Sequence, residues 1–141
     1  MGGNMEFRVA IVQGSESDNQ LGDISADILK SYNIECDRYV ISAHRNPEEL
    51  AKFCESANEK YGVIIAIAGL SAALPGVIAS RTRIPVIGVP VDAGPLNGVD
   101  ALLSIVQMPS GVPVACMGIG KSGAKNAAHL TARILGISSD K

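Results

Sequence analysis

The sequence is poor in aromatic residues and carries no excess of positive charge. Its 141 residues include three tyrosines, two phenylalanines and no tryptophan, and the formal net charge is −2. A chain of this charge lacks the bulk attraction for phosphate on which nucleic-acid binding rests. So few aromatic rings also leave no platform on which bases could stack. We therefore expect no nucleic-acid partner, although the composition still allows a local site for a small anion.

Cysteine is also scarce, and its spacing excludes the usual frameworks. Cys36, Cys54 and Cys116 are an odd, widely spaced set without a CxxC pair, and neither histidine lies at ligand spacing from any of them. Free thiols in a reducing compartment are the ordinary interpretation of this pattern. The first 14 residues lack the basic start and long apolar stretch of a secretory signal. We predict a cytoplasmic protein without a metal site.

Two uncharged runs, residues 62–80 and 101–120, are the only candidates for a membrane span. Both are long enough in principle, but glycine and proline interrupt each of them near its middle. The first run is better interpreted as a buried strand, a loop and a helix. We expect no membrane association.

Short apolar runs alternate with helical patterns along the chain, and apolar residues make up 47% of it. This length and composition predict a single domain over residues 7–137. Residues 1–6 are expected to be a flexible N-terminus or a cloning remnant, and residues 138–141 a C-terminal tail. The predicted strands span residues 7–13, 34–41, 63–68, 84–89 and 112–117. Helices are expected to begin near residues 18, 47, 69, 98 and 122.

Five alternations of strand and helix predict an α/β fold with a mostly parallel, doubly wound sheet. We expect the first strand to lie at its centre. Ligands of such sheets bind beyond the carboxyl ends of the strands, at the switch point. The loops at residues 14–18, 42–45 and 69–76 should therefore converge.

The loop at residues 42–45 carries the strongest candidate for chemistry. An imidazole can give and take a proton near neutral pH, so His44 could transfer protons. The planar guanidinium of Arg45 could hold a phosphate. Two ordinary interpretations stay open: His44 as a loop histidine without function, and Arg45 as a solvated partner of Glu48 or Glu49.

The other two loops offer binding groups. Residues 14–18 can present amides, hydroxyls and a helix N-terminus to an anion or a sugar. Ser15 would bind a phosphate or hydroxyl and Asp18 a ribose, although an ordinary turn capped by Ser17 or Asp18 explains the pattern equally well. The small side chains of residues 69–76 would let a planar ligand lie against the backbone, or would serve close packing of helix on sheet.

Six segments together resemble the PurE family of purine biosynthesis. They are GSESD (14–18), SAHRNP (42–47), AGLSAALPG (68–76), IPVIGVPV (84–91), GVDALLSIVQMPSGVPVA (98–115) and KNAAHLTARILG (125–136). The resemblance covers nearly the whole chain. It implies a flavodoxin-like three-layer sandwich around a central five-stranded, mostly parallel sheet.

The resemblance also implies an activity. This is the conversion of N5-carboxyaminoimidazole ribonucleotide to 4-carboxy-5-aminoimidazole ribonucleotide without metal or organic cofactor, in a homo-octamer with sites at subunit boundaries. A related subgroup carboxylates aminoimidazole ribonucleotide with CO2 directly, which is the first alternative. The second is a non-catalytic nucleotide-binding or flavin-binding module, although the scarcity of aromatics argues against a flavin sandwich.

Residue by residue, the resemblance makes His44 the general acid and base. It implies a CO2-retaining pocket walled by the segments at residues 69–76 and 108–113. The family usually carries a second histidine where this chain has Ala73. The expected substrate-binding residues are Ser15, Asp18, Ser42, Arg45, Gly69, Ser71, Ala73 and Leu74.

Overall fold

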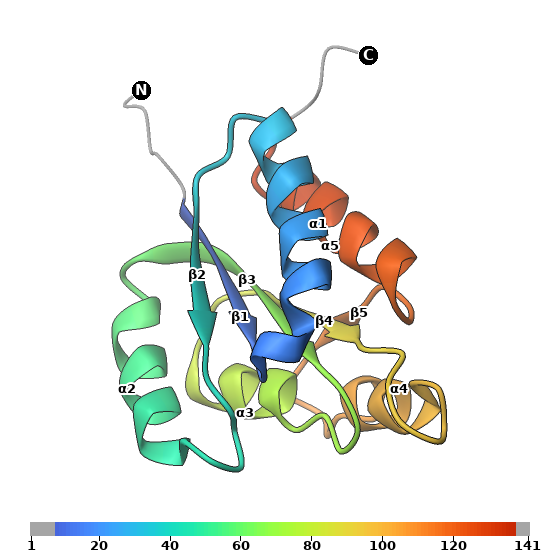
Figure 1. The fold of residues 1–141 in the computed structure, drawn as a ribbon. Coiled ribbons are helices and arrows are strands. Elements are labelled where there is room, and N and C mark those ends of the chain that lie inside the picture. Colours follow the sequence, from blue (N-terminus) through green and yellow to red (C-terminus); the bar gives the residue numbers. More distant parts are fainter. Residues whose placement is uncertain (1–7, 138–141) are drawn as a thin grey trace.

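The chain forms a three-layer α/β sandwich, seen in a computed structural model that describes residues 8–137 (Figure 1). The expected N-terminal segment and C-terminal tail lie outside the described residues. The strands are β1 (Arg8–Gln13), β2 (Cys36–Val40), β3 (Tyr61–Ala68), β4 (Val86–Pro90) and β5 (Ala115–Cys116). The helices are α1 (Asn19–Ser31), α2 (Pro47–Ala57), α3 (Leu74–Arg81), α4 (Val99–Val106) and α5 (Lys121–Ile134), with a short 3-10 helix η1 (Glu16–Asp18).

The sheet is parallel throughout, with strand order β2-β1-β3-β4-β5. Our prediction that the first strand is central is wrong, because β3 occupies the middle. Seven of the eight residues of β3, YGVIIAIA, are buried, and such a continuous apolar strand needs cover on both faces. The order reverses between β1 and β3, and this reversal is the switch point at which α/β sheets bind ligands.

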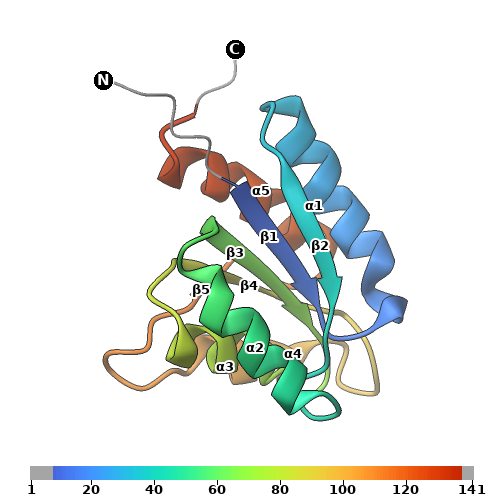
Figure 2. The same ribbon diagram turned by 90° about the vertical axis from the view of Figure 1, so that its left-hand side faces the viewer.

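Two apolar cores flank the sheet. Helices α1 and α5 lie side by side on one face, and α2, α3 and α4 cover the other (Figures 1 and 2). Alternate residues of β1 serve the two faces: Val9 and Ile11 pack with α1 and α5, whereas Ala10 and Val12 pack toward α2 and α3. This arrangement confirms the predicted fold class.

The fifth strand is much shorter than predicted. Residues 112–117 were expected to form it, but only Ala115–Cys116 pair with β4. Pro113 has no amide hydrogen to donate to a ladder. Val112 instead donates to Pro109 O in a turn, with an N–O distance of 3.1 Å. The chain therefore reaches the sheet edge only after this turn.

Two predicted helix starts differ in detail, whereas α2 begins at Pro47 as expected. Neither Ser17 nor Asp18 caps α1 with its side chain, because the chain first forms η1, whose cap is Ser15. Asn46 stands at the cap of α2 with Pro47 following, but its side chain makes no capping hydrogen bond. The third helix begins only at Leu74, which leaves residues 69–73 as a loop.

Gly88 of β4 lets α3 and α4 pack closely against the sheet. A Cβ at this position would lie 2.5 Å from Ile105 Cγ2 and 3.3 Å from Pro75 Cβ. Overpacking of a filled core costs about 1–3 kcal/mol. The Gly88→Ala substitution should therefore lower the free energy of unfolding by about 1–3 kcal/mol in urea titrations. Gly14→Ala is the control, because its added Cβ would meet only Ile67 O at 3.9 Å; equal losses for both would contradict this packing.

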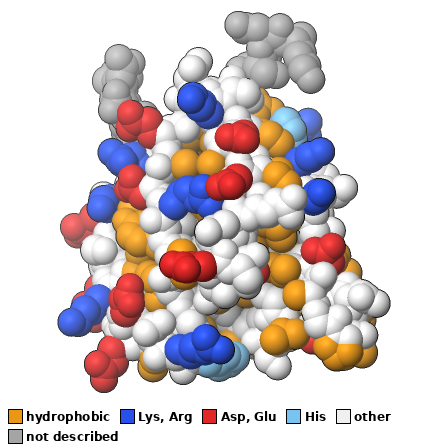
Figure 3. Space-filling model, in the orientation of Figure 1, with side chains coloured by type: hydrophobic (Ala, Val, Ile, Leu, Met, Phe, Trp, Pro, Cys, Tyr) orange, Lys and Arg blue, Asp and Glu red, His pale blue; other side chains and the backbone are white. Residues whose placement is uncertain are grey.

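The surface is unevenly apolar. Figure 3 shows hydrophobic side chains gathered at the lower right, over α4, where Leu96, Val99, Leu103 and Val106 are each about half exposed. Within residues 8–137, no helix is both long and apolar enough to cross a membrane. The first uncharged run forms β3, a loop and α3, as predicted.

Candidate functional site

The three predicted loops converge on one cavity of about 510 Å³ at the carboxyl ends of β1, β2 and β3. All the site residues expected from the sequence line it, and this shared placement is a geometric finding, whereas their roles remain predictions. The lining residues are Gly14, Ser15, Ser17, Asp18, Ser42, Ala43, His44, Arg45, Ala68, Gly69, Leu70, Ser71, Ala72, Ala73, Leu74 and Ala93.

The first loop is a tight turn folded around Ser15. The Ser15 hydroxyl accepts hydrogen bonds from Ser17 N at 3.2 Å and from Ser17 Oγ at 3.0 Å. Its carbonyl accepts from Asp18 N at 3.1 Å. These bonds leave the Ser15 and Ser17 hydroxyls exposed at the cavity, where they can meet a polar ligand.

Asp18 differs from its neighbours because it is only 7% exposed. Burial raises the pKa of its carboxyl, and a backbone hydrogen bond from Ser15 opposes that rise in part. A buried carboxylate is stabilised when the hydroxyl groups of a ligand donate hydrogen bonds to it in place of the water that burial removed. Asp18 is therefore suited to bind a polyol such as a sugar ring.

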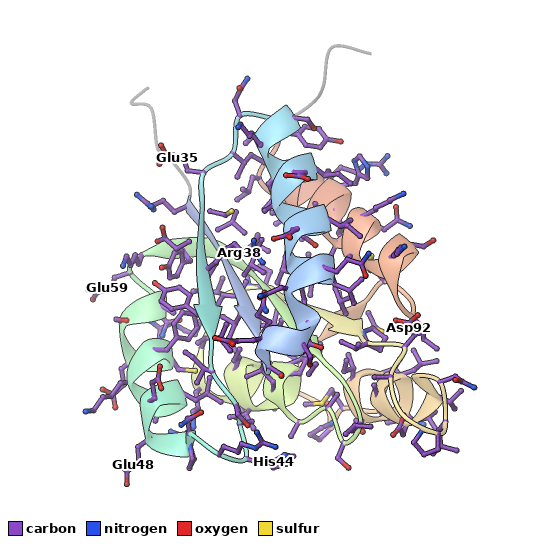
Figure 4. All side chains as sticks on the ribbon, viewed as in Figure 1. Glu35, Arg38, His44, Glu48, Glu59 and Asp92 are labelled. Carbon is purple, nitrogen blue, oxygen red and sulfur yellow. The ribbon has the colours of Figure 1, made fainter. Side chains whose placement is uncertain are left out.

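The second loop turns sharply after β2. The Ser42 hydroxyl accepts from Arg45 N at 3.1 Å, and the Ser42 carbonyl accepts from Asn46 N at 2.8 Å. This turn presents the exposed side chains of His44 and Arg45 at the lower edge of the molecule, where Figure 4 labels His44.

Among the residues that the structure describes, none forms an ion pair with the Arg45 guanidinium. The ion pairs found within residues 8–137 involve Arg8 and Arg38, and neither Glu48 nor Glu49 pairs with Arg45. Its guanidinium is therefore free to bind an anion in the cavity. The ordinary interpretation of Arg45 as a partner of these glutamates is not what the structure contains.

The third loop walls the cavity with backbone and small side chains. Gly69 is closely packed, since a Cβ there would lie 3.2 Å from Val91 Cβ. Two tight turns follow, in which Ala72 N donates to Leu70 O and Ala73 N to Ser71 O. Leu74 is buried, so it contributes apolar floor.

Ala73 stands at the start of α3 and is half-buried at the cavity wall. At the position where the PurE resemblance implies an imidazole, this chain presents a methyl group. The titratable side chains that line the cavity are Asp18, His44 and Arg45. Any proton transfer at this site by an imidazole must therefore use His44, unless another chain contributes a second one.

Two lining residues of the cavity, Ala68 and Ala93, lie outside the three predicted loops. Leu70 adopts a left-handed backbone with φ of 56°, and no sequence signal marks a leucine for that conformation. Ala93 reaches the cavity from the loop after β4. The segment at residues 108–113 does not line the cavity of the single chain. Met108 lies beside α3 instead, where a Cβ on Gly76 would meet its sulfur at 3.1 Å.

The second histidine lies away from this cavity. His129 Nδ1 is 2.7 Å from Tyr32 OH, and the two rings meet edge to face. This contact joins the end of α1 to α5, so His129 packs between these two helices. The three cysteines are free, with Cys54 buried.

Comparison with known proteins shows which family this chain resembles in sequence and structure. The AIR carboxylase family model matches residues 8–141. N5-carboxyaminoimidazole ribonucleotide mutase of Escherichia coli K12 is 53% identical over 133 residues, covering 94% of this chain and 79% of that protein. The mutase of Bacillus subtilis is 51% identical over 132 residues, covering 93% and 82%.

Solved structures agree with the sequence relatives. The crystal structure of Treponema denticola PurE superposes with a TM-score of 0.80 at 31% identity, covering 92% of this chain and 80% of that one. Because the family model spans almost every residue and these relatives are aligned over most of their own length, this chain belongs to the AIR carboxylase family.

Proposed function

We propose that this chain is an N5-carboxyaminoimidazole ribonucleotide mutase of de novo purine biosynthesis. It converts its substrate to 4-carboxy-5-aminoimidazole ribonucleotide. The observation that carries the proposal is one cavity that combines an exposed imidazole, an unpaired guanidinium and a buried carboxylate. The names of relatives about half identical to this chain support the same activity.

Binding follows from the chemistry of each loop. Arg45 and the nearby Ser42 hold the 5′-phosphate, because a planar guanidinium donates two parallel hydrogen bonds to phosphate oxygens. Ser15 donates to the phosphate or a ribose hydroxyl, and Asp18 accepts from ribose hydroxyls. Gly69, Ser71, Ala73 and Leu74 form the wall against which the imidazole ring lies.

His44 then acts as acid and base in turn. The N5 carbamate loses CO2, and N5 takes a proton from the His44 imidazolium. The ring carbon C4 attacks the retained CO2 to form the new carbon–carbon bond. The C4 proton returns to His44, which restores its starting state and balances the reaction. One group that serves in both directions near neutral pH suits an imidazole.

The released CO2 must stay near C4 until it is recaptured, which requires a closed and apolar surrounding. In the single chain the cavity opens to solvent beside the exposed Leu70. We propose that the enzyme is a homo-octamer in which neighbouring subunits close the sites at their boundaries. The half-exposed apolar side chains along α4 support such contacts. Light scattering on a sizing column measures the subunit count directly.

Direct carboxylation of aminoimidazole ribonucleotide with CO2 is the alternative that uses the same cavity. The mutase names of the relatives favour the first activity. Supplying each substrate separately and following product absorbance decides between them. We expect the enzyme to work in the cytoplasm, where its three free cysteines would stay reduced.

The Arg45→Ala substitution tests the phosphate role. It should raise the Kd of the ribonucleotide about 3–10-fold, because Arg45 is exposed and its attraction is partly screened by solvent. Calorimetric titration with the ribonucleotide and with its phosphate-free nucleoside provides the comparison. Equal weakening of both ligands would contradict a contact with phosphate.

A further inference from the structure

Gln13 is a polar side chain in an otherwise apolar strand. It ends β1 and is 1% exposed, and both the nitrogen and the oxygen of its carboxamide form hydrogen bonds. Its Nε2 donates to Ser15 O at 3.0 Å and to Asn19 Oδ1 at 2.6 Å. Its Oε1 accepts from Arg38 Nη2 at 3.0 Å. A buried amide satisfied this completely holds one orientation.

Arg38 determines that orientation. It projects from β2 toward α1 (Figure 4), and its Nη1 donates to Asp23 Oδ1 at 2.5 Å. A guanidinium only donates hydrogen bonds, so the oxygen of the Gln13 carboxamide must face it. The NH2 group then points at the Ser15 carbonyl and at Asn19, which both accept.

The helix is shaped to admit this pair. A Cβ on Gly22 of α1 would lie 2.4 Å from Arg38 Nη2 and 2.4 Å from Gln13 Oε1. A side chain at residue 22 would push both of these groups from their positions, so Gly22, Arg38 and Gln13 pack as one unit.

The backbone of Gln13 reaches the second loop of the site. Its carbonyl accepts from Ile41 N at 2.9 Å, and Ile41 directly precedes the loop that carries His44. One residue therefore fixes both loops, the first through its side chain and the second through its main chain.

We propose that Gln13, oriented by Arg38, is a positioning residue that holds the Ser15 loop in the geometry that binds substrate. The substrate part of this inference rests on the proposed mutase function. Because the Ser15 loop contacts ligand in the ground state and the transition state alike, loosening it should weaken binding more than chemistry.

Two substitutions separate the parts of the unit. Gln13→Met keeps the volume and removes all three hydrogen bonds. Gln13→Glu keeps the acceptor for Arg38, but it has no donor for the Ser15 carbonyl, which its second oxygen repels. Ser25→Ala is the matched control, because it also removes a buried hydrogen bond of α1, from Ser25 Oγ to Ala124 O at 2.7 Å, away from the cavity.

Steady-state kinetics and amide exchange by NMR are measured on the wild type and all three variants. Both Gln13 variants should raise KM about tenfold with kcat within about threefold, and should speed exchange of the Ser17 and Asp18 amides about tenfold. Ser25→Ala should change neither KM nor these exchange rates.

Unchanged exchange at Ser17 and Asp18 in both Gln13 variants would overturn the inference, whatever the enzyme does. So would a KM in the Gln13 variants that matches the Ser25→Ala value. A wild type that neither binds nor converts the ribonucleotide would instead contradict the proposed function, while the exchange rates would still decide whether Gln13 holds the loop.

Discussion

The His44→Asn substitution is expected to lower kcat for N5-carboxyaminoimidazole ribonucleotide by about 10²–10⁴-fold, the usual contribution of general acid and base catalysis. Asparagine can donate a hydrogen bond as imidazole does, but it cannot take or release a proton at neutral pH. The Kd of the ribonucleotide should change less than about threefold, since Arg45, Ser15 and Asp18 are intact. Turnover followed by product absorbance, with binding measured by calorimetry, separates the two quantities.

The chain supplies its own control for this experiment. His129 is the second of its two histidines and contacts Tyr32 between α1 and α5. His129→Asn should leave kcat unchanged. His44 is exposed, so its replacement should shift the free energy of unfolding by no more than about 0.5 kcal/mol. A near-normal kcat in His44→Asn would remove His44 from the chemistry.

The Asp18→Asn substitution should have opposite effects on activity and stability. It exchanges the buried carboxylate for an amide, which weakens hydrogen bonds to ribose hydroxyls and should lower kcat/KM about 10–100-fold. The same change removes the cost of burying a charge, so Tm at pH 7 should rise by about 2–4 °C. Kinetics and thermal unfolding test the two halves separately. A fall in both quantities would show that Asp18 is structural.

The pH dependence of stability gives a second test of Asp18. Burial raises the pKa of this carboxyl in the folded chain above its value in the unfolded chain. The folded state therefore binds the proton more tightly, and this group favours folding most at low pH. Its contribution is lost as pH rises from the ordinary aspartate range through the raised pKa. Urea titrations across this pH range should show the free energy of unfolding of the wild type falling by the Asp18 contribution, and no such contribution in Asp18→Asn.

The local elements that position the site could be predicted because their causes are local. Asn33 and Gly136 lie just after α1 and α5, and both have the positive φ angles, 61° and 74°, that their residue types favour after a helix. The three loops could be brought together because the carboxyl ends of parallel strands share one edge of a sheet. The PurE resemblance is confirmed by the family model and the sequence relatives.

The remainder depends on contacts between distant segments, which sequence patterns do not encode. Gln13 appeared as the polar end of a strand, and only the approach of Arg38 past Gly22 gives it a function. Strands β1 and β3 are both apolar enough to be covered on two faces. Their sequences alone therefore do not show which of them lies at the centre of the sheet. The left-handed Leu70 has no signal in the sequence because glycine or asparagine ordinarily marks that backbone.

Turnover of N5-carboxyaminoimidazole ribonucleotide by the purified chain is the most direct test. We expect 4-carboxy-5-aminoimidazole ribonucleotide to form from that substrate alone, with activity lost in His44→Asn and retained in His129→Asn. Product formed only from aminoimidazole ribonucleotide and added CO2, or a ligand bound by the wild type without conversion, would contradict this expectation.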